Sequence, residues 1–313
     1  MNDASLSASD SRRAERASLV AEAERIIREG SKSFRFSSNL FDQATRERAW
    51  LLYSWCRACD DLADGQTLGH GAAAPADPER RIAFIRDTTA RALAGERVGI
   101  APFDALRVVA AECAIPRRYI DDHLEGFALD AEGWRPRTEE DLLRYCYHVA
   151  GAVGCMMAVV MGVSPDEEDT LDRAADLGIA FQLANIARDI VEDHAVGRVY
   201  LPAEWLPTEG IDPDDRPALA GIAQRLAALV ERYEASARVG AARLSFRARW
   251  AVLSAANIYG AIARRVAQRG AEAWDSRTII HKPSKLAFVA KALIECGEHP
   301  PVRSRAGLWT RPG

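Results

Sequence analysis

The stretch at residues 177–193, LGIAFQLANIARDIVED, decides the predicted fold of this chain. On a helix that turns about 100° per residue, small and polar side chains fall on one narrow stripe. This stripe contains Gly178, Gln182, Asn185, Asp189 and Asp193. The other faces carry Ile179, Leu183, Ile186 and Ile190, which can pack into a core. A mostly buried helix with carboxylates and amides on one stripe needs a partner for them, because burying unsatisfied polar groups is costly.

The two aspartates of this stripe suggest what that partner is. Asp189 and Asp193 are one helical turn apart, so their like charges repel each other. A hard cation bound by both carboxylates would remove the repulsion. A solvated acidic helix end would also be stable, and for this pair alone it is the simpler interpretation.

A second acidic stretch favours the cation. Residues 53–64 read YSWCRACDDLAD, and a helix places four of their side chains on one face: Tyr53, Arg57, Asp60 and Asp64. Asp61 lies beside that face, and each aspartate pair has an arginine nearby, Arg57 in the first and Arg188 in the second. Two acidic helices that face each other repel unless cations and a polyphosphate lie between them. Magnesium is usually held by one or two carboxylates plus phosphate oxygens of the substrate. The pair of motifs therefore predicts a magnesium–diphosphate site.

Composition indicates a globular helical protein. The chain has 313 residues, of which 48% are hydrophobic and 27% charged, with a net charge of -4. These values are ordinary for a soluble domain, and no basic surface for nucleic acid is indicated. The long runs show helical rather than alternating periodicity, which predicts an all-α fold. We expect one helical domain at residues 16–296, a disordered tail at 1–15 and an irregular tail at 297–313.

The N-terminus and the cysteines predict a cytoplasmic protein. Residues 1–30 contain no hydrophobic signal region. Cys56 and Cys59 form a CxxC inside a helical pattern, without the second CxxC that a zinc site of this type requires. All six cysteines are therefore interpreted as reduced thiols.

Several local signals set element boundaries. Residues 31–41, SKSFRFSSNLF, predict a loop in which Ser33 and its basic neighbours can meet phosphate. Pro116 predicts a break in a helical pair, and Thr138 with Asp141 predicts a capping box. Two further helices are predicted at residues 213–240 and 246–270.

The uncharged run at residues 145–162 has two interpretations. Its length is near the lower limit for a membrane span, but Gly151 and Gly154 interrupt it, so a buried core helix is favoured. Ala150, Gly151, Ala152 and Gly154 either permit close helix approach or leave room for a chain-like ligand.

In several motifs the chain resembles the squalene/phytoene synthase family of head-to-head prenyl transferases. The matching motifs are SKSF at 31–34, YSWCRACDDLAD at 53–64, DDHLEGFALD at 121–130, RYCYHVAGAVG at 144–154, FQLANIARDIVED at 181–193 and GRVYLP at 197–202. They extend over nearly the whole chain apart from the first dozen residues.

The resemblance implies an isoprenoid synthase fold and assigns roles. Helices are expected around a central cavity, with the two Asp-rich motifs facing each other. The implied metal ligands are Asp60, Asp64, Asn185, Asp189 and Asp193. The implied catalytic residues are these aspartates with Tyr53 and Arg57. The implied substrate-binding residues are Ser31, Ser33, Phe34, Arg57, Tyr145, Gln182, Asn185, Arg188, Tyr259 and Arg277.

The resemblance also implies a reaction. Mg²⁺, with Mn²⁺ as the alternative, assists departure of diphosphate, a second prenyl diphosphate attacks the allylic cation, and a cyclopropyl diphosphate is formed and rearranged. The expected substrate is geranylgeranyl diphosphate and the expected product is 15-cis-phytoene, the first committed step of carotenoid biosynthesis, without NADPH. Enzymes that use C15 chains, forming dehydrosqualene, squalene or presqualene diphosphate, are the alternatives. Expected partners are other carotenoid-pathway enzymes and, peripherally, the inner face of the membrane.

Two unrelated classes of protein fit the sequence less well. A di-iron carboxylate protein would need Glu-x-x-His motifs, and no histidine here has a glutamate three residues before it. A non-catalytic helical scaffold would show no effect of magnesium and diphosphate on its melting.

Overall fold

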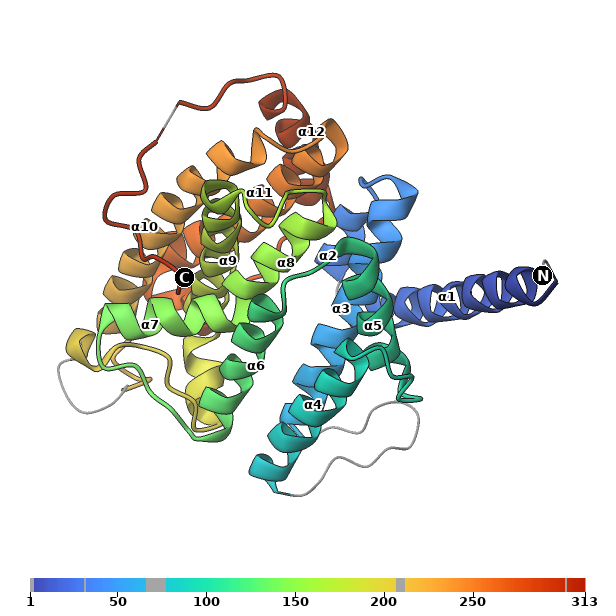
Figure 1. Cartoon of the computed structure of the whole chain (residues 1–313). Coiled ribbons are helices and arrows are strands. Elements are labelled where there is room, and N and C mark those ends of the chain that lie inside the picture. Colours follow the sequence, from blue (N-terminus) through green and yellow to red (C-terminus); the bar gives the residue numbers. More distant parts are fainter. Residues whose placement is uncertain (1–2, 31, 66–76, 207–211, 302, 313) are drawn as a thin grey trace. The chain divides into compact units, whose positions relative to one another are not determined.

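The computed structural model describes residues 3–30, 32–65, 77–206, 212–301 and 303–312, and these ranges contain helices, turns and irregular segments but no β-strand (Figure 1). The all-α prediction is therefore confirmed. Contacts divide the chain into two compact units, Met1–Pro116 and Arg117–Gly313. The division follows the break predicted at Pro116 and was not expected from the prediction of one domain at 16–296.

The first unit is built from five helices within its described residues. They are α1 (Asp3–Gly30), α2 (Lys32–Ser38), α3 (Gln43–Ala63), α4 (Pro78–Leu93) and α5 (Ala101–Cys113). The helix α3 packs against α1, α4 and α5 and buries Leu51, Leu52 and Trp55 among them. Its start is fixed by Asp42, whose side chain accepts a hydrogen bond from the Thr45 backbone N–H at 3.0 Å.

Two predictions for the N-terminal region were wrong. Residues 1–15 were predicted as a disordered tail, but α1 begins at Asp3. Ion pairs within the first unit hold this helix, since Glu15 contacts Arg107 at 2.6 Å and Arg16 contacts Glu47 at 2.6 Å. Such long-range pairs leave no signal in the local sequence.

The second correction concerns residues 31–41, which were predicted as a loop. Residues 32–38 form the helix α2. Its last residue, Ser38, is fully buried and accepts a hydrogen bond from the Trp50 indole N–H at 3.0 Å. Burial of this end against α3 outweighs the weak helix propensity of the serines.

The second unit contains the remaining described elements. They are α6 (Arg117–Ala131), α7 (Glu139–Cys146), the π-helical turn η1 (Tyr147–Gly151), α8 (Ala152–Val160), α9 (Glu168–Ala195), the 3₁₀ turn η2 (Ala203–Trp205), α10 (Arg216–Ala241), α11 (Phe246–Arg269), the 3₁₀ segment η3 (Gly270–Trp274) and α12 (Lys282–Glu295). The predicted capping box is confirmed, because Thr138 and Asp141 exchange both hydrogen bonds at the start of α7. The helices predicted at 213–240 and 246–270 are confirmed as α10 and α11.

The helix α9, which contains residues 177–193, is the centre of this unit. It packs against α8, η1, α10 and α11. Ile179, Leu183, Ile186 and Ile190 are all buried, as predicted. The apolar run at Glu139–Val160 is long and apolar enough to cross a membrane, but 67% of its window is buried inside the protein. That burial supports the interpretation as a core helix.

Small residues let η1 and α8 approach α9 closely. A Cβ atom at Gly178 would lie 2.2 Å from the backbone oxygen of Ala150, and one at Gly154 would lie 2.3 Å from that of Ala174. These glycines therefore serve helix–helix contact rather than leaving space for a ligand chain. The suggestion that Gly154 lines a tunnel for the substrate is wrong for this residue, because its open side is filled by α9.

Gly178→Ala is expected to destabilise the protein by about 1–3 kcal/mol, because the added methyl group meets backbone that cannot rotate away. Urea denaturation followed by circular dichroism measures this loss. Gly221→Ala is the matched control, since a Cβ there meets nothing within 4 Å and the residue lies in α10. A stability of Gly178→Ala equal to that of the wild type would contradict the close contact.

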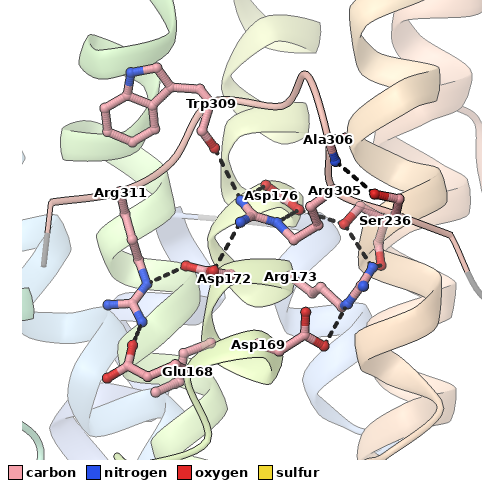
Figure 2. A network of polar contacts seen from close by, with 12 residues as sticks. Glu168, Asp169, Asp172, Arg173, Asp176, Ser236, Arg305, Ala306, Trp309 and Arg311 are labelled. Carbon is pink, nitrogen blue, oxygen red and sulfur yellow. Dashed lines mark hydrogen bonds and ion pairs between the residues drawn. The ribbon is translucent and has the colours of Figure 1, made fainter.

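The C-terminal segment was predicted to be irregular, and residues 297–301 and 303–312 contain no helix or strand. It is nevertheless anchored to the first half of α9 (Figure 2). The Arg305 guanidinium donates two hydrogen bonds to the Asp176 carboxylate, at 2.8 and 2.9 Å, and a third to Asp172 at 2.9 Å. Asp176 is fully buried and also accepts a hydrogen bond from the Ser236 hydroxyl at 2.5 Å.

A second set of contacts fastens the end of the same segment. Arg311 pairs with Asp172 at 2.7 Å and with Glu168 (Figure 2). The Trp309 backbone N–H donates to the Tyr233 hydroxyl at 3.0 Å, and the Trp309 ring lies 5.2 Å from that of Tyr147. The segment thus ties together α9, α10 and η1.

Candidate active site

The first acidic motif lies at the C-terminal end of α3. Arg57, Asp60 and Asp64 all reach the surface of this helix, while Ala58, Cys59 and Leu62 are buried. The predicted face is therefore confirmed as the outward face of α3. Asp64 is the first residue after the helix and caps it, with its N–H donating to the Asp60 carbonyl at 3.0 Å.

Arg57 already binds the acids of its own helix. Its guanidinium lies 2.6 Å from Asp61 and 3.7 Å from Asp60. The Asp60 side chain is 57% exposed, against 23% for Asp61. Asp60 is thus placed to bind a ligand from solvent, and Asp61, which was not predicted as a site residue, orients Arg57.

The aromatic residues predicted for this unit come together. The rings of Phe34 on α2 and Tyr53 on α3 stack with centroids 5.2 Å apart. A Cβ atom at Gly30 would lie 2.7 Å from the Tyr53 hydroxyl, so this glycine makes room for it. Ser31 lies outside the described residues, as does the side chain of Ser33, so their predicted contacts with substrate stay predictions.

The second motif is the stripe on α9. Gln182, Asn185, Arg188 and Asp189 are all half-buried, unlike their fully buried neighbours. Both Arg188 and Arg277 pair with Asp189, Arg188 through its Nε at 2.8 Å and Arg277 at 3.1 Å. Arg277 also pairs with Glu192. The sequence predicted Arg188, Asp189 and Arg277 for the site, and the structure brings these three together; Glu192 was missed.

Asp193 carries a charge that its surroundings do not fully compensate. Burial, and then the negative charge of Asp189, raise the pKa of its carboxyl to about 6, although Arg198 opposes the change. A partly buried carboxylate beside another negative charge is stabilised by a nearby cation.

The donor set on α9 fits magnesium. The oxygens of Asn185, Asp189 and Asp193 are hard ligands spaced along one stripe. Among the described residues, no three or more His, Cys, Asp or Glu side chains gather closely enough to hold a metal ion. Magnesium is usually held by one or two carboxylates together with phosphate oxygens of its substrate. Arg188 and Arg277 would have to release Asp189 when a metal binds.

Tyr145 is fixed within the second unit by its ring and its hydroxyl. Its ring stacks on those of Trp134, at 5.5 Å, and Tyr200, at 4.9 Å. The hydroxyls of Tyr145 and Tyr200 both donate to Asp130, at 2.9 and 3.1 Å. Burial raises the pKa of Tyr145 well above its usual value, so the phenol stays protonated. Asp130 and Tyr200 were not predicted as site residues, although the motifs DDHLEGFALD and GRVYLP contain them.

Tyr259 on α11 is held in a similar way. Its ring stacks on Phe181 of α9 with centroids 4.2 Å apart. Burial raises the pKa of Tyr259, and the positive charge of Arg188 opposes the shift. The positive charge of Arg188 therefore acts on Tyr259, and the sequence assigned both residues to the site.

Comparisons with known proteins agree with this arrangement. The sequence model of the squalene/phytoene synthase family matches residues 27–284. The chain is 45% identical to the 15-cis-phytoene synthase of Pantoea ananas, over 94% of this chain and 98% of that protein. It is 44% identical to the phytoene synthase of Pseudescherichia vulneris, with the same two coverages.

Among solved structures, a dehydrosqualene synthase superposes with a TM-score of 0.78 at 25% identity, over 89% of this chain and 96% of that one. Its likeness confirms the predicted isoprenoid synthase fold. The family match, the identity to these relatives and the two acidic helices together show that the chain belongs to the squalene/phytoene synthase family.

Proposed function

We propose that this protein is a prenyl transferase that condenses two molecules of geranylgeranyl diphosphate, head to head, to 15-cis-phytoene, with release of diphosphate. The observation that carries the proposal is the 45% identity to a 15-cis-phytoene synthase over almost the full length of both chains. We infer that the acidic helices, the arginines beside them and the aromatic residues serve this one reaction. A C15 substrate, giving dehydrosqualene or squalene, is the alternative.

The charged residues bind the diphosphate group. When bound, Mg²⁺ neutralises the diphosphate and lowers its barrier to leaving; Asp60, Asp64, Asn185, Asp189 and Asp193 would hold it. Arg57, Arg188 and Arg277 now contact aspartates of the motifs. We infer that they transfer these hydrogen bonds to diphosphate oxygens, which guanidinium groups bind in pairs.

The stacked tyrosines face the carbon skeleton in this proposal. After diphosphate leaves, an allylic cation must be kept from water until the second alkene attacks it. Tyr53, Tyr145 and Tyr259 each lie in an aromatic stack that fixes the ring. A carbocation can lie beside such a ring without reacting with it, because a protonated phenol is a weak nucleophile.

The proposal includes where the enzyme works. We propose a cytoplasmic protein that touches the inner face of the membrane peripherally, since its substrate and product are long hydrocarbons. Mg²⁺ is the proposed cofactor, with Mn²⁺ as substitute, and no NADPH is required.

Incubation with defined prenyl diphosphates tests the proposal. Purified protein is given geranylgeranyl or farnesyl diphosphate with Mg²⁺, with and without NADPH, and the product is identified by mass and ultraviolet spectrum. We expect a C40 hydrocarbon from geranylgeranyl diphosphate, no dependence on NADPH, and loss of product when EDTA removes the metal. Better use of farnesyl diphosphate, or a strict NADPH requirement, would assign the protein to the C15 alternatives.

A further inference from the structure

The helix α12 leaves an unusual amount of apolar surface uncovered. All 14 of its residues are described, and only Ala292 among them is buried. Leu286 is 60%, Leu293 44% and Ile294 69% exposed. Three large aliphatic side chains on one short helix are more than the scattered exposed residues of an ordinary surface.

These side chains lie on one face. Positions 286, 290 and 293 follow the i, i+4, i+7 spacing of a helical stripe, and 287 and 294 follow it one residue later. We call Leu286, Ala287, Ala290, Leu293 and Ile294 the α12 apolar face, and each of them is exposed.

Other groups of α12 hold it against α11 (Figure 1). The Trp250 indole N–H donates to the Val289 carbonyl at 2.9 Å, and the Arg249 guanidinium donates to the Glu295 carbonyl at 3.0 Å. Ala292 packs with Leu253 in the small core between the two helices. The α12 apolar face is thus not used to fold the unit.

The charge around this face is mostly positive. The whole chain has a net charge of -4, yet the only acid in α12 is its last residue, Glu295, which pairs with Lys291 at 3.4 Å. The chain has only four lysines among its many basic residues, and three of them, Lys282, Lys285 and Lys291, lie in α12. Lysine has a long apolar stem that lies along apolar surface while its ammonium group stays in water. Such a helix is typical of a segment that lies in a membrane interface.

We propose that the α12 apolar face docks the protein on an anionic lipid bilayer, with the lysines against the lipid headgroups. A second copy of this chain fits poorly, because a symmetric contact would bring the lysines of both copies together. A helix of 14 residues is about 21 Å long, which is too short to span a bilayer core, so α12 lies on the surface. This docking rests on the proposed function and names the surface for its membrane contact, since a bilayer is where a prenyl substrate and a C40 product would reside.

Vesicle sedimentation with the full-length protein, in the absence of substrate, tests the proposal. The probes are vesicles of phosphatidylcholine alone and of phosphatidylcholine with phosphatidylglycerol at about 7:3, chosen to supply the anionic surface potential that attracts lysines. We expect L286S/L293S/I294S to lower the partition coefficient on anionic vesicles at least ~10-fold, because three aliphatic side chains no longer enter the interface. We expect K282Q/K285Q/K291Q to lower it on anionic vesicles by about 10-fold or more and hardly at all on neutral ones.

Two matched controls separate the face from general effects. Val196→Ser removes a side chain that is 70% exposed but lies outside α12, and it should bind vesicles like the wild type. R80Q/R97Q/R117Q removes three positive charges from other exposed sites and should reduce binding far less than the lysine triple. Thermal melting of each variant shows that the fold is kept.

Several outcomes would overturn the docking surface. The proposal is overturned if L286S/L293S/I294S binds anionic vesicles as well as the wild type does. It is also overturned if K282Q/K285Q/K291Q and R80Q/R97Q/R117Q lose the same amount of vesicle binding. A change from dimer to monomer in L286S/L293S/I294S during analytical ultracentrifugation, with vesicle binding unchanged, would assign the face to a second copy instead. Activity is scored separately in detergent micelles, where L286S/L293S/I294S should act like the wild type. An inactive but vesicle-bound wild type would reject the proposed reaction while leaving the docking surface in place.

Discussion

Asp189→Asn is expected to lower kcat/KM by about 10³-fold or more, since the loss of a magnesium ligand removes several kcal/mol of transition-state stabilisation. Asp60→Asn should have an effect of the same size, because the proposed site needs an acid from each motif. Helical content should stay unchanged, as both side chains reach the surface of their helices. Steady-state kinetics with geranylgeranyl diphosphate and far-ultraviolet circular dichroism measure the two properties.

A binding experiment separates metal loss from general damage. Mg²⁺ with inorganic pyrophosphate should raise the Tm of the wild type and leave that of Asp189→Asn nearly unchanged. Asp121→Asn is the control, because this aspartate is also on a helix surface, is 54% exposed, and pairs with Arg117 at 3.2 Å. Full activity of Asp189→Asn, or equal losses in the control, would reject the metal assignment.

The second large effect concerns the C-terminal segment. Arg305→Met is expected to reduce the free energy of unfolding by about 3–5 kcal/mol, the usual cost of leaving one partner of a buried ion pair uncompensated. This loss of stability is expected because Asp176 is 0% exposed and receives two of its hydrogen bonds from Arg305. Urea denaturation followed by circular dichroism gives the value.

The double variant D176N/R305M shows whether the charge is responsible. It removes the buried carboxylate as well, so it should be more stable than Arg305→Met alone. Arg232→Met is the matched control, since Arg232 donates to the Gly307 carbonyl of the same segment at 2.8 Å from an exposed position and should cost less than about 1 kcal/mol. Arg305→Met as stable as Arg232→Met would mean that the anchor contributes little to folding.

The polar stripe of α9 could be predicted from the sequence, for a local reason. On a helix, neighbours on one face are three or four residues apart, so the spacing of Gln182, Asn185 and Asp189 already places them together. The same rule separated the buried isoleucines of α9 from its polar stripe. Capping signals such as Thr138 with Asp141 are equally local. For these features, a window of one or two turns contains all of the physical information.

The partners of those surfaces were decided only by the tertiary structure. Gly178 was placed on the polar stripe, but it serves a contact with Ala150, which lies on another helix. Arg305 and Asp176 are 129 residues apart, and no periodicity in the sequence connects them. The stack of Trp134, Tyr145 and Tyr200 likewise joins three separate segments.

The contrast between α9 and α12 gives the physical reason. Both helices have apolar side chains at helical spacing along one face. Whether such a face is covered depends on which other helix packs against it, and that choice is made by contacts distant in the chain. In α9 the face is buried under α10 and α11, whereas in α12 Leu286, Leu293 and Ile294 stay exposed. The sequence by itself determined the helices α9, α10 and α11, the acidic stripes and the family of this protein. The tertiary structure decided which polar groups are paired and which apolar face is left for a partner, because burial is a property of the packed chain.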